Sequence, residues 1–226
     1  MQGRKRIAIY GGTFDPVHLG HLAVARRTVE LFEIDKLLFV PARQAPHKLE
    51  QEVTHPLHRY TMLALATQND RQILVSSFEL AAPDRRYTID TLAHFQAEFG
   101  KQADLFFVMG ADSWTEITTW RHWERLLTTA NHIVVTRPGY EMQLDHVASL
   151  ANPIVDVRGW DPPRVSHVLK ESSGPSVYLT DTAMMDISAT AIRDAVRTGQ
   201  GNELKNLVPE PVAEYINKYE LYKEFE

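Results

Sequence analysis

RIAIYGGTFDPVHLGH, residues 6–21, joins a short apolar run to a glycine pair and then to the start of a helical pattern. The run at 6–10 is apolar after its first residue, which is typical of a strand buried on both faces of a sheet. Downstream of the stretch, apolar residues recur at helical spacing: Leu22, Ala25, Val29 and Phe32. A buried strand that leads into a helix predicts the first unit of a parallel sheet.

The same alternation continues along the chain. Further strands are predicted at 37–40, 73–79, 105–109, 133–136 and 177–180. Helices are predicted at 57–67, from an N-cap at Thr88 to a stop at Gly100, and at 123–130, 188–198 and 212–222. This order predicts an α/β fold, a doubly wound and mainly parallel sheet with helices on both faces. In such sheets ligands bind beyond the carboxyl ends of the strands, near the topological switch point.

The length of the chain predicts a single domain over residues 1–226. The stretch 140–175 is less regular, because Asp161-Pro162-Pro163 and Ser172-Ser173-Gly174-Pro175 are typical of breakers. We expect an irregular insertion there rather than a second domain.

Composition excludes several classes of protein. Hydrophobic residues make up 44% of the chain and charged residues 23%, as in ordinary globular proteins, and the net charge of -5 argues against a nucleic-acid-coating surface. With no cysteine, disulfides, thiolate nucleophiles and cysteine-ligated zinc are excluded. The apolar run after the basic start is too short for a signal peptide, and no run of about 18 apolar residues predicts a membrane span. The expected location is cytoplasmic.

The glycines and histidines after the first strand carry the chemistry. Gly11 and Gly12 permit a tight turn whose N–H groups face an anion. His18 and His21 share one face of a helix start, and Gly20 removes a side chain that would block a ligand there. Two imidazoles over such a turn can bind a triphosphate and stabilise charge that develops on it. The pattern is neither the dinucleotide fingerprint nor the Walker loop.

Each of these features, taken by itself, also has another interpretation. A histidine pair alone is more often structural, and a glycine pair is usually only a turn. A metal site at His18 and His21 lacks an adjacent third ligand of the expected kind. The combination, in this order after the first strand, favours phosphate binding.

A second segment, ISATAIR at 187–193, offers matching chemistry. Ser188 can cap a helix whose free N–H groups favour phosphate. Arg193 can reach the same anion with its planar fork of donors. Taken alone, these two residues are equally consistent with a cap and a surface charge.

Together the two segments resemble the signatures of the nucleotidyltransferases with a His-x-Gly-His motif, whose fold is Rossmann-like. The second signature of that family has the form Ile-Ser-x-Thr-x-Ile-Arg. Ala189 stands where the family often has serine, so a hydroxyl contact is lost there, while the cap and Arg193 remain.

Within that superfamily the chain is most similar to the bacterial nicotinate-nucleotide adenylyltransferases, over nearly its full length. The similarity rests on Pro46-His47-Lys48, Arg59, Tyr87-Thr88-Ile89-Asp90-Thr91, Gly110-Ala111-Asp112-Ser113, Thr119-Trp120, Arg137-Pro138-Gly139, Tyr215-Ile216 and Leu221-Tyr222. It implies an enzyme of NAD biosynthesis that joins ATP and nicotinate mononucleotide into nicotinate adenine dinucleotide and releases pyrophosphate.

The resemblance also implies roles for individual residues. The expected catalytic residues are His18, His21 and Arg193. The expected ATP-binding residues are Gly11, Gly12, Thr13, Phe14, Gly20, Gly110, Asp112, Ile187, Ser188 and Thr190. The expected residues for the acceptor substrate are His47, Lys48, Tyr87, Thr88, Trp120 and Arg137. Tyr87 and Trp120 are also consistent with plain core residues.

The helix start at Thr88 favours a carboxylate, because free N–H groups bind one well, whereas an amide would leave a donor unpaired. Such a mismatch discriminates by factors up to about 10⁴, so we expect preference for the acid over the amide. Mg²⁺ is expected to be held mainly by ATP phosphates and water, with no protein metal site. We expect no nucleic-acid or membrane partner, and the oligomeric state stays open, a homo-oligomer included.

Three alternatives compete. The first is an adenylyltransferase for another phosphorylated acceptor, such as nicotinamide mononucleotide. A phosphopantetheine adenylyltransferase or a cytidylyltransferase would leave Thr88, Trp120 and Pro46-His47-Lys48 without a role. A class I aminoacyl-tRNA synthetase would need a longer chain. A non-catalytic nucleotide-binding regulator would usually have lost the phosphate-contacting residues that this sequence keeps.

Overall fold

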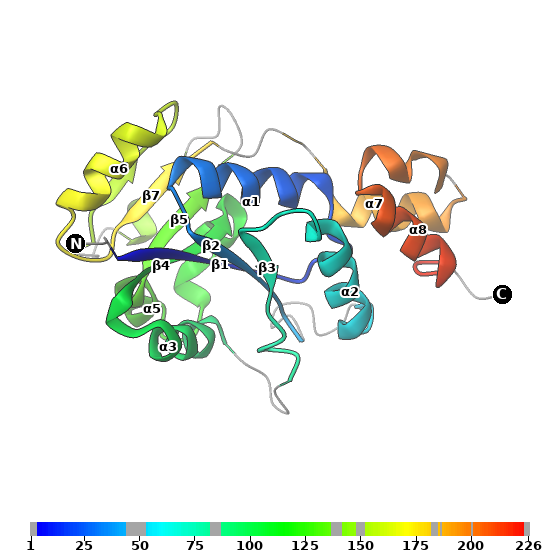
Figure 1. Cartoon of the computed structure of the whole chain (residues 1–226), viewed down its shortest axis with the longest axis horizontal. Coiled ribbons are helices and arrows are strands. Elements are labelled where there is room, and N and C mark those ends of the chain that lie inside the picture. The colour runs from blue at the N-terminus through cyan, green and yellow to red at the C-terminus, as the bar shows by residue number, and fades with distance from the viewer. Residues whose placement is uncertain are drawn as a thin grey trace.

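A parallel sheet runs through the centre of the molecule in the computed structural model, which describes residues 4–43, 53–81, 87–136, 142–147, 152–181, 185, 187–199 and 201–223 (Figure 1). The sheet has seven strands in the described part of the chain, ordered β3-β2-β1-β4-β5-β7-β6. Their bounds are Lys5–Gly12 (β1), Lys36–Pro41 (β2), Ile73–Val75 (β3), Ala103–Gly110 (β4), Asn131–Val135 (β5), Ile154–Asp156 (β6) and Val177–Thr180 (β7). Every paired strand is parallel to its neighbour.

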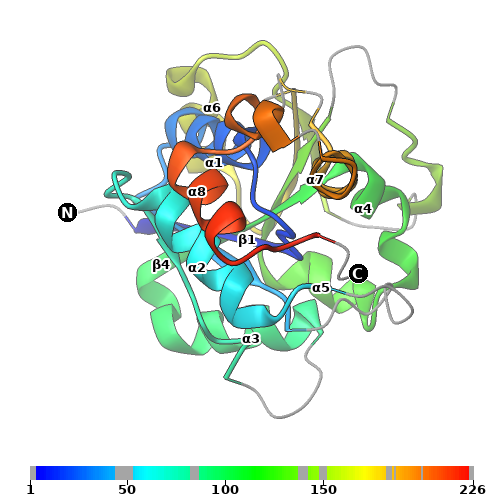
Figure 2. The same ribbon diagram turned by 90° about the vertical axis from the view of Figure 1, so that its right-hand side faces the viewer.

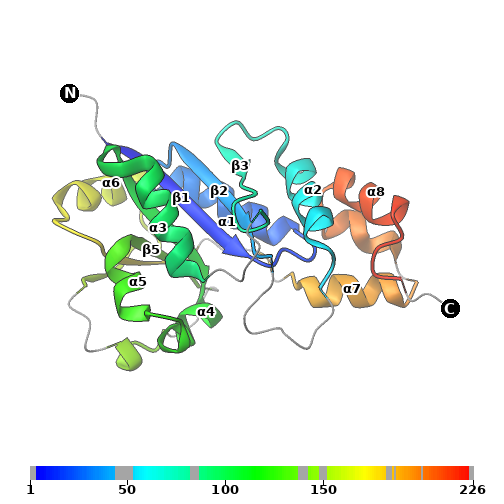
Figure 3. The same cartoon turned by 90° about the horizontal axis from the view of Figure 1, so that it is seen from below.

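Helices cover both faces of this sheet. One face carries α1 (Leu19–Leu31) and α6 (Pro162–Glu171), and the other carries α3 (Thr88–Phe99), α4 (Ala111–Thr115) and α5 (Trp123–Thr129), as Figures 1 and 3 show. Beyond the ends toward which the strands run lie α2 (Pro56–Thr67), α7 (Ala189–Arg197) and α8 (Glu210–Lys218), which face the viewer in Figure 2. Short 3-10 turns occupy Gly100–Gln102 (η1), Ile117–Thr119 (η2), Asp145–Val147 (η3) and Gly201–Asn206 (η4). The predicted doubly wound α/β fold is confirmed.

The strands are apolar on both faces because both faces are covered. In β1, Ala8 belongs to the core under α1, while Ile7 and Ile9 belong to the core under α3, and all three are buried. Strand β1 lies between β2 and β4. After β3, at one edge of the sheet, the chain returns past β1 and adds β4 on the other side of β1 in the strand order. The carboxyl ends of β1 and β4 therefore flank the topological switch point, where such sheets bind ligands.

The strand predicted at 73–79 is too long. Only Ile73–Val75 pairs with β2, and the chain then leaves the sheet edge. The Ser76 hydroxyl accepts a hydrogen bond from the Phe78 N–H at 3.2 Å. A local bond of this kind competes with the sheet ladder, which explains the early end of the strand.

The irregular structure predicted at 140–175 is wrong for much of the described part of that stretch. Strand β6 pairs with β7 at the sheet edge, and α6 follows it. Asp161 caps α6 by accepting a hydrogen bond from the Arg164 N–H at 3.1 Å, and the prolines after Asp161 occupy the first turn. Proline is favoured there because the first helical N–H groups have no partner in the helix, so the predicted breaker is a helix start.

Two helix ends also differ from the prediction. Tyr87, rather than Thr88, is the N-cap of α3, because the Asp90 carboxylate accepts a hydrogen bond from the Tyr87 N–H at 3.2 Å. Helix α8 begins at Glu210 and ends at Lys218, earlier than the predicted 212–222. None of the helices in the described residues combines the length and apolarity that a membrane crossing needs.

Candidate active site

His18 and His21 form a reciprocal pair at the start of α1. His18 is the N-cap, and its Nδ1 accepts a hydrogen bond from the His21 N–H at 3.4 Å. The Nδ1 of His21 accepts in turn from the His18 N–H at 3.2 Å. The two rings stack with their centroids 3.6 Å apart. Two N–H groups at the helix start are thus satisfied by imidazoles, in the manner of a capping box.

This pairing determines the protonation state of both rings. A neutral imidazole that accepts at Nδ1 carries its proton on Nε2, so each ring presents an Nε2–H donor. Burial lowers the pKa of His18 to about 4. Burial, and then repulsion from His18, keeps the pKa of His21 well below its usual value. Near pH 7 the pair therefore offers two neutral donors whose Nε2 atoms make no hydrogen bond with the described residues.

Gly20 is required by the histidine ring itself. A Cβ at this position would lie 3.0 Å from the His18 Nδ1 and 3.2 Å from the His18 Cε1. The main-chain oxygen of Met185, in the segment before α7, would be 3.7 Å away. The missing side chain therefore lets the His18 ring fold back over the helix start, and the segment that leads to α7 lies beside it.

The tight turn predicted at Gly11 and Gly12 is wrong. Both residues belong to β1 and pair with Val40 and Pro41 of β2. They are small because aromatic rings lie over them: a Cβ on Gly12 would be 2.8 Å from the Phe14 ring. The chain turns instead at Phe14, whose φ of 52° is in the left-handed region.

Phe14 and Arg59 are buried and contact the loop between β1 and α1. The Phe14 ring is buried and packs edge-on against His21, with centroids 5.0 Å apart. Arg59 of α2 is fully buried and donates to the carbonyl oxygens of Thr13 at 2.6 Å and Thr54 at 2.9 Å. Two further bonds reach the carbonyls of Ala42 and Arg43. Arg59 therefore ties the first loop to the exit of β2.

The second signature lies at the start of α7. Ser188 is the N-cap, as predicted, but its hydroxyl makes no capping bond and is exposed. Arg193 donates to the main-chain oxygen of Asp15 at 2.8 Å and to the Thr190 Oγ1 at 3.3 Å. Ile187 packs against the core. The structure thus brings the two signatures together, with an open helix start and a guanidinium beside the His18 loop.

The other predicted ATP-binding residues lie at the end of β4. Gly110 is the N-cap of α4, and Asp112 is exposed in its first turn. Since β4 is the neighbour of β1, these residues share the carboxyl edge of the sheet with Gly12.

The predicted acceptor residues that the structure describes lie on the α3 side of this edge. Trp120 packs edge-on against Phe107 of β4, and its Nε1 is buried without a hydrogen-bond partner among the described residues. The adjacent Arg121 places its guanidinium carbon 4.8 Å from the centre of the Tyr87 ring. No pattern in the sequence predicts a place for Arg121 beside Tyr87. Thr88 opens α3 at the same place, although Asp90 already occupies the Tyr87 N–H.

Three predicted substrate residues, His47, Lys48 and Arg137, lie outside the described residues. Among the described ones, Asp15 and Tyr222 were not predicted as site residues, yet the Tyr222 hydroxyl donates to the Asp15 Oδ1 at 2.7 Å. The signal for Asp15 was its place inside the first signature, and for Tyr222 its place in the resemblance. In the described ranges, no three or more His, Cys, Asp or Glu side chains group so as to hold a metal ion.

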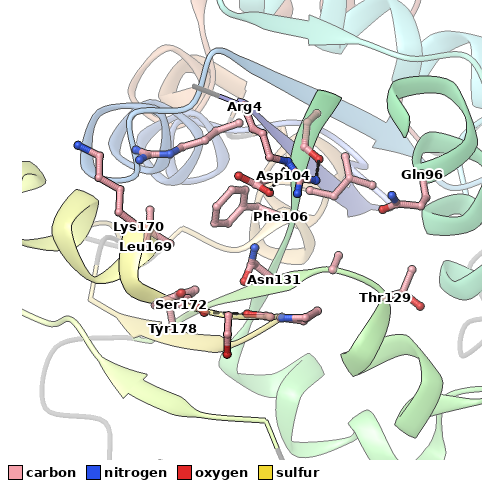
Figure 4. A pocket seen from close by; sticks show the side chains of 17 residues that line it. Arg4, Gln96, Asp104, Phe106, Thr129, Asn131, Leu169, Lys170, Ser172 and Tyr178 are labelled. Atoms are coloured by element: carbon pink, nitrogen blue, oxygen red, sulfur yellow. Dashed lines mark hydrogen bonds and ion pairs between the residues drawn. The ribbon is translucent and has the colours of Figure 1, made fainter. Parts of the chain in front are cut away.

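A cavity of about 550 Å³ lies at the opposite, amino end of the strands (Figure 4). Its cations are largely neutralised within the protein: Arg4 pairs with Asp104 at 3.1 Å and Arg6 with Glu33 at 2.9 Å. This cavity is separate from the two signatures.

Comparison with known proteins places these features in context. The model of the cytidylyltransferase-like family matches residues 9–195. A protein of Thermoanaerobacter sp. (strain X514), named as a probable nicotinate-nucleotide adenylyltransferase, is 37% identical over 226 residues, which are 100% of this chain and 98% of that protein. A protein of the same name from Corynebacterium jeikeium (strain K411) is 36% identical over 94% of this chain and 98% of its own length.

A solved structure has the same fold. It is the Plasmodium falciparum nicotinic acid mononucleotide adenylyltransferase complexed with NaAD, with a TM-score of 0.71 and 22% identity over 96% of this chain and 97% of that chain. At this identity the likeness concerns the fold alone.

Proposed function

The chain belongs to the cytidylyltransferase-like family and, within it, to the nicotinate-nucleotide adenylyltransferases, and from this premise we propose that it transfers AMP from ATP to nicotinate mononucleotide. The products are nicotinate adenine dinucleotide and pyrophosphate. The family predicted from the two signatures is confirmed.

The observation that carries the proposed chemistry is the reciprocal pair of His18 and His21. The main-chain N–H of each histidine donates to the Nδ1 of the other, which fixes both rings in the tautomer that carries its proton on Nε2. These Nε2–H donors lie at the start of α1, beside the segment that leads to the open start of α7. Preorganised donors of this kind stabilise the charge that develops on a phosphate in the transition state.

We assign the reaction to in-line attack by a phosphate oxygen of nicotinate mononucleotide on the α-phosphorus of ATP. The new P–O bond forms as the bond to the β-phosphate oxygen breaks, and pyrophosphate leaves. The attacking oxygen is already anionic near pH 7, so no general base is needed. Catalysis then depends on positioning and on stabilisation of charge.

The phosphates of ATP are assigned to the junction of the two signatures. His18 and His21 bind them through Nε2, and the main-chain N–H groups near Gly11, Gly12, Thr13, Phe14 and Gly20 line the approach. Arg193 and the start of α7, with Ile187, Ser188 and Thr190, hold the leaving pyrophosphate. Two donors of the Arg193 fork contact Asp15 and Thr190, so the others remain for the ligand.

Mg²⁺ enters this site as part of the substrate, Mg²⁺-ATP. The donors described there are imidazole, guanidinium and helix N–H groups, which suit the phosphate oxygens rather than the metal. The nearby Asp15 carboxylate already accepts hydrogen bonds from Tyr222 and Thr54. The metal keeps its ligands from phosphate and water, as Mg²⁺ commonly does. Gly110 and Asp112 are assigned to the ribose of the nucleotide, because a carboxylate there can accept from its hydroxyls.

The acceptor is assigned to the space between α3 and Trp120. Thr88 and Ile89 N–H groups at the start of α3 make no hydrogen bond with the described residues, so they can bind the nicotinate carboxylate. Trp120 and Tyr87 flank the pyridine ring, and the buried Nε1–H of Trp120 has no hydrogen-bond partner among the described residues. From the resemblance, His47, Lys48 and Arg137 are assigned to the acceptor, with Lys48 as the candidate for a substrate phosphate. We also propose one catalytic domain that acts in the cytoplasm on these small molecules, without nucleic acid or membrane.

The test is pyrophosphate release from Mg²⁺-ATP with nicotinate mononucleotide, with nicotinamide mononucleotide, and with no acceptor. We expect release with the acid, release weaker by about 10²-fold or more with the amide, and none without an acceptor. Equal rates with acid and amide would overturn the carboxylate site at α3 and keep the adenylyl transfer. No release with either acceptor would overturn the proposed function, and ATP binding measured by calorimetry would then identify a nucleotide-binding protein.

A further inference from the structure

Asp15 receives hydrogen bonds from three segments that are far apart in the chain. The Tyr222 hydroxyl donates to its Oδ1 at 2.7 Å, and the Thr54 N–H donates to its Oδ2 at 3.0 Å. Arg193 donates to its main-chain oxygen at 2.8 Å. The residue itself is 5% exposed and stands three positions before His18. Asp15 is thus the point where the first signature, the entrance of α2, the second signature and the C-terminal segment meet.

A buried carboxylate requires compensation, and the surroundings of Asp15 supply it. Both oxygens accept a hydrogen bond, and the fully buried Arg59 attracts the same charge. Arg59 also donates to the carbonyls of Thr13 and Thr54, the segments on either side of the Asp15 carboxylate. The arrangement is a connected polar network, in which the loss of one member leaves a buried charge without a partner.

The C-terminal segment is shaped to reach this network. Helix α8 is joined to α2 by a hydrogen bond of 2.8 Å between His58 and Tyr215. After α8 the chain turns through Glu220 and Tyr222, whose φ angles of 50° and 68° are left-handed. Residues with side chains adopt such angles when the surrounding structure holds them there. Burial, and then the Asp15 charge, raises the pKa of Tyr222, so its hydroxyl remains a donor.

We propose that Asp15 and Tyr222 are positioning residues for the adenylyl transfer: the Tyr222 hydroxyl holds Asp15, and Asp15 holds both the loop that presents His18 and the guanidinium of Arg193. Neither residue touches the reacting atoms. The proposal rests on the proposed function and adds to it that the C-terminal segment sets the geometry of both signatures. Because phosphoryl chemistry of this kind depends on placement, a shift of about 1 Å in the loop lowers turnover strongly.

The experiment compares Tyr222→Phe with Tyr219→Phe. Both variants lose one tyrosine hydroxyl from the same segment, but the Tyr219 side chain is 49% exposed, and its hydroxyl makes no hydrogen bond with the described residues. We expect Tyr222→Phe to lower kcat about tenfold, with little change in the KM for nicotinate mononucleotide. Tyr219→Phe is expected to match the wild type. Thermal unfolding of both variants, by circular dichroism, reports whether either one loses its fold.

A second measurement needs no substrate. Amide hydrogen exchange, followed by mass spectrometry on peptides that cover residues 13–22, reports the order of the His18 loop directly. We expect faster exchange there in Tyr222→Phe and in Asp15→Asn, and wild-type exchange in Tyr219→Phe. A loss of stability alone would raise exchange throughout the protein, whereas a positioning role raises it selectively in these peptides, which contain Asp15.

Three outcomes separate the proposals. Equal kcat and equal exchange in Tyr222→Phe and Tyr219→Phe would overturn the positioning role. A lower melting temperature in Tyr222→Phe with unchanged kcat and loop exchange would also overturn it and assign the bond to stability alone. If the wild type releases no pyrophosphate, the proposed function fails, whereas the exchange experiment still decides whether the C-terminal segment orders the loop.

Discussion

The guanidinium of Arg193 donates a hydrogen bond to the main-chain oxygen of Asp15 at 2.8 Å, across 178 residues of the chain. This bond joins the two signatures that the sequence shows only as separate segments. It also orients the fork of Arg193 at the side of the His18 loop, since a second donor is held by Thr190. A guanidinium held in this way loses little conformational freedom when it binds a phosphate.

Arg193→Lys tests the importance of the fork. An ammonium can keep one of the two protein contacts but not both contacts and the phosphate, so we expect kcat/KM for ATP to fall by about 10²-fold. Steady-state pyrophosphate release measures it. Arg197→Lys on the same helix is the control, because Arg197 pairs with Asp194 at the surface. An Arg193→Lys enzyme as active as the control would remove Arg193 from the catalytic set.

His18→Asn separates catalysis from helix capping. Asparagine is a good N-cap, so the free energy of unfolding should change by less than about 1 kcal/mol, whereas His18→Ala should lose about that much. Both variants lack the Nε2–H donor, and we expect kcat to fall by about 10²- to 10³-fold in each. Urea denaturation and single-turnover kinetics measure the two effects. Retained turnover in His18→Asn would show that the imidazole only caps the helix.

Gly20→Ala should lower activity without lowering stability. Alanine favours a helix over glycine by up to about 1 kcal/mol, but its Cβ would press on the His18 ring, which lies 3.0 Å away at Nδ1. We therefore expect a melting temperature close to that of the wild type and a kcat at least about fivefold lower. Gly174→Ala is the matched control, because a Cβ there has no neighbour within 4 Å. A fully active Gly20→Ala enzyme would contradict the close packing of the His18 ring.

Buried histidines predict the response to acid. Burial lowers the pKa of His132 to about 4, against the opposing effect of the Ala130 backbone. The unfolded chain binds protons near pH 6.5 and the folded one near pH 4, so stability is complete above pH 6.5 and falls as the pH drops from 6.5 toward 4. His18 and His21 act in the same direction.

His132→Leu isolates one of these contributions. Between pH 7 and pH 5 the variant should lose about 2 kcal/mol less unfolding free energy than the wild type, because one protonation site of the unfolded chain is gone. Urea denaturation at the two pH values measures the difference. His167→Leu, at an exposed position on α6, is the control. Identical losses in the wild type and His132→Leu would mean that His132 titrates alike in both states.

Much of the fold was predictable because it depends on local pattern. Buried parallel strands leave continuous apolar runs, and β1, β2, β4, β5 and β7 were all predicted from them. Strand β6 has only three residues, too few for a pattern, and the prolines of α6 have opposite meanings inside a helix and at its start. Local sequence does not separate these two cases without the neighbouring Asp161 cap.

The site was predictable only in part, for a related reason. His18, His21 and Arg193 stand in short segments with distinctive spacing, and the structure brings these segments together as predicted. The structural reason for the glycines was not predictable. Gly12 is required because the Phe14 ring packs over it, and the sequence pattern of such a glycine is the same as that of a glycine required by a turn. The contact between Asp15 and Tyr222 spans 207 residues, and no spacing rule links positions so far apart.

The separation of Asp15 and Tyr222 in the sequence affects when the active-site loop can be held in place during synthesis of the chain. At typical rates of protein synthesis, roughly 10–40 s separate the addition of Asp15 from that of Tyr222 at the ribosome. Late in this interval, after Thr180 has been added, strands β1 to β7 can pair, but the loop of the first signature still lacks its hydrogen bond from Tyr222. Chains stalled before residue 222 would therefore lack this positioning contact, and we expect them to turn over substrate less efficiently than chains that include it.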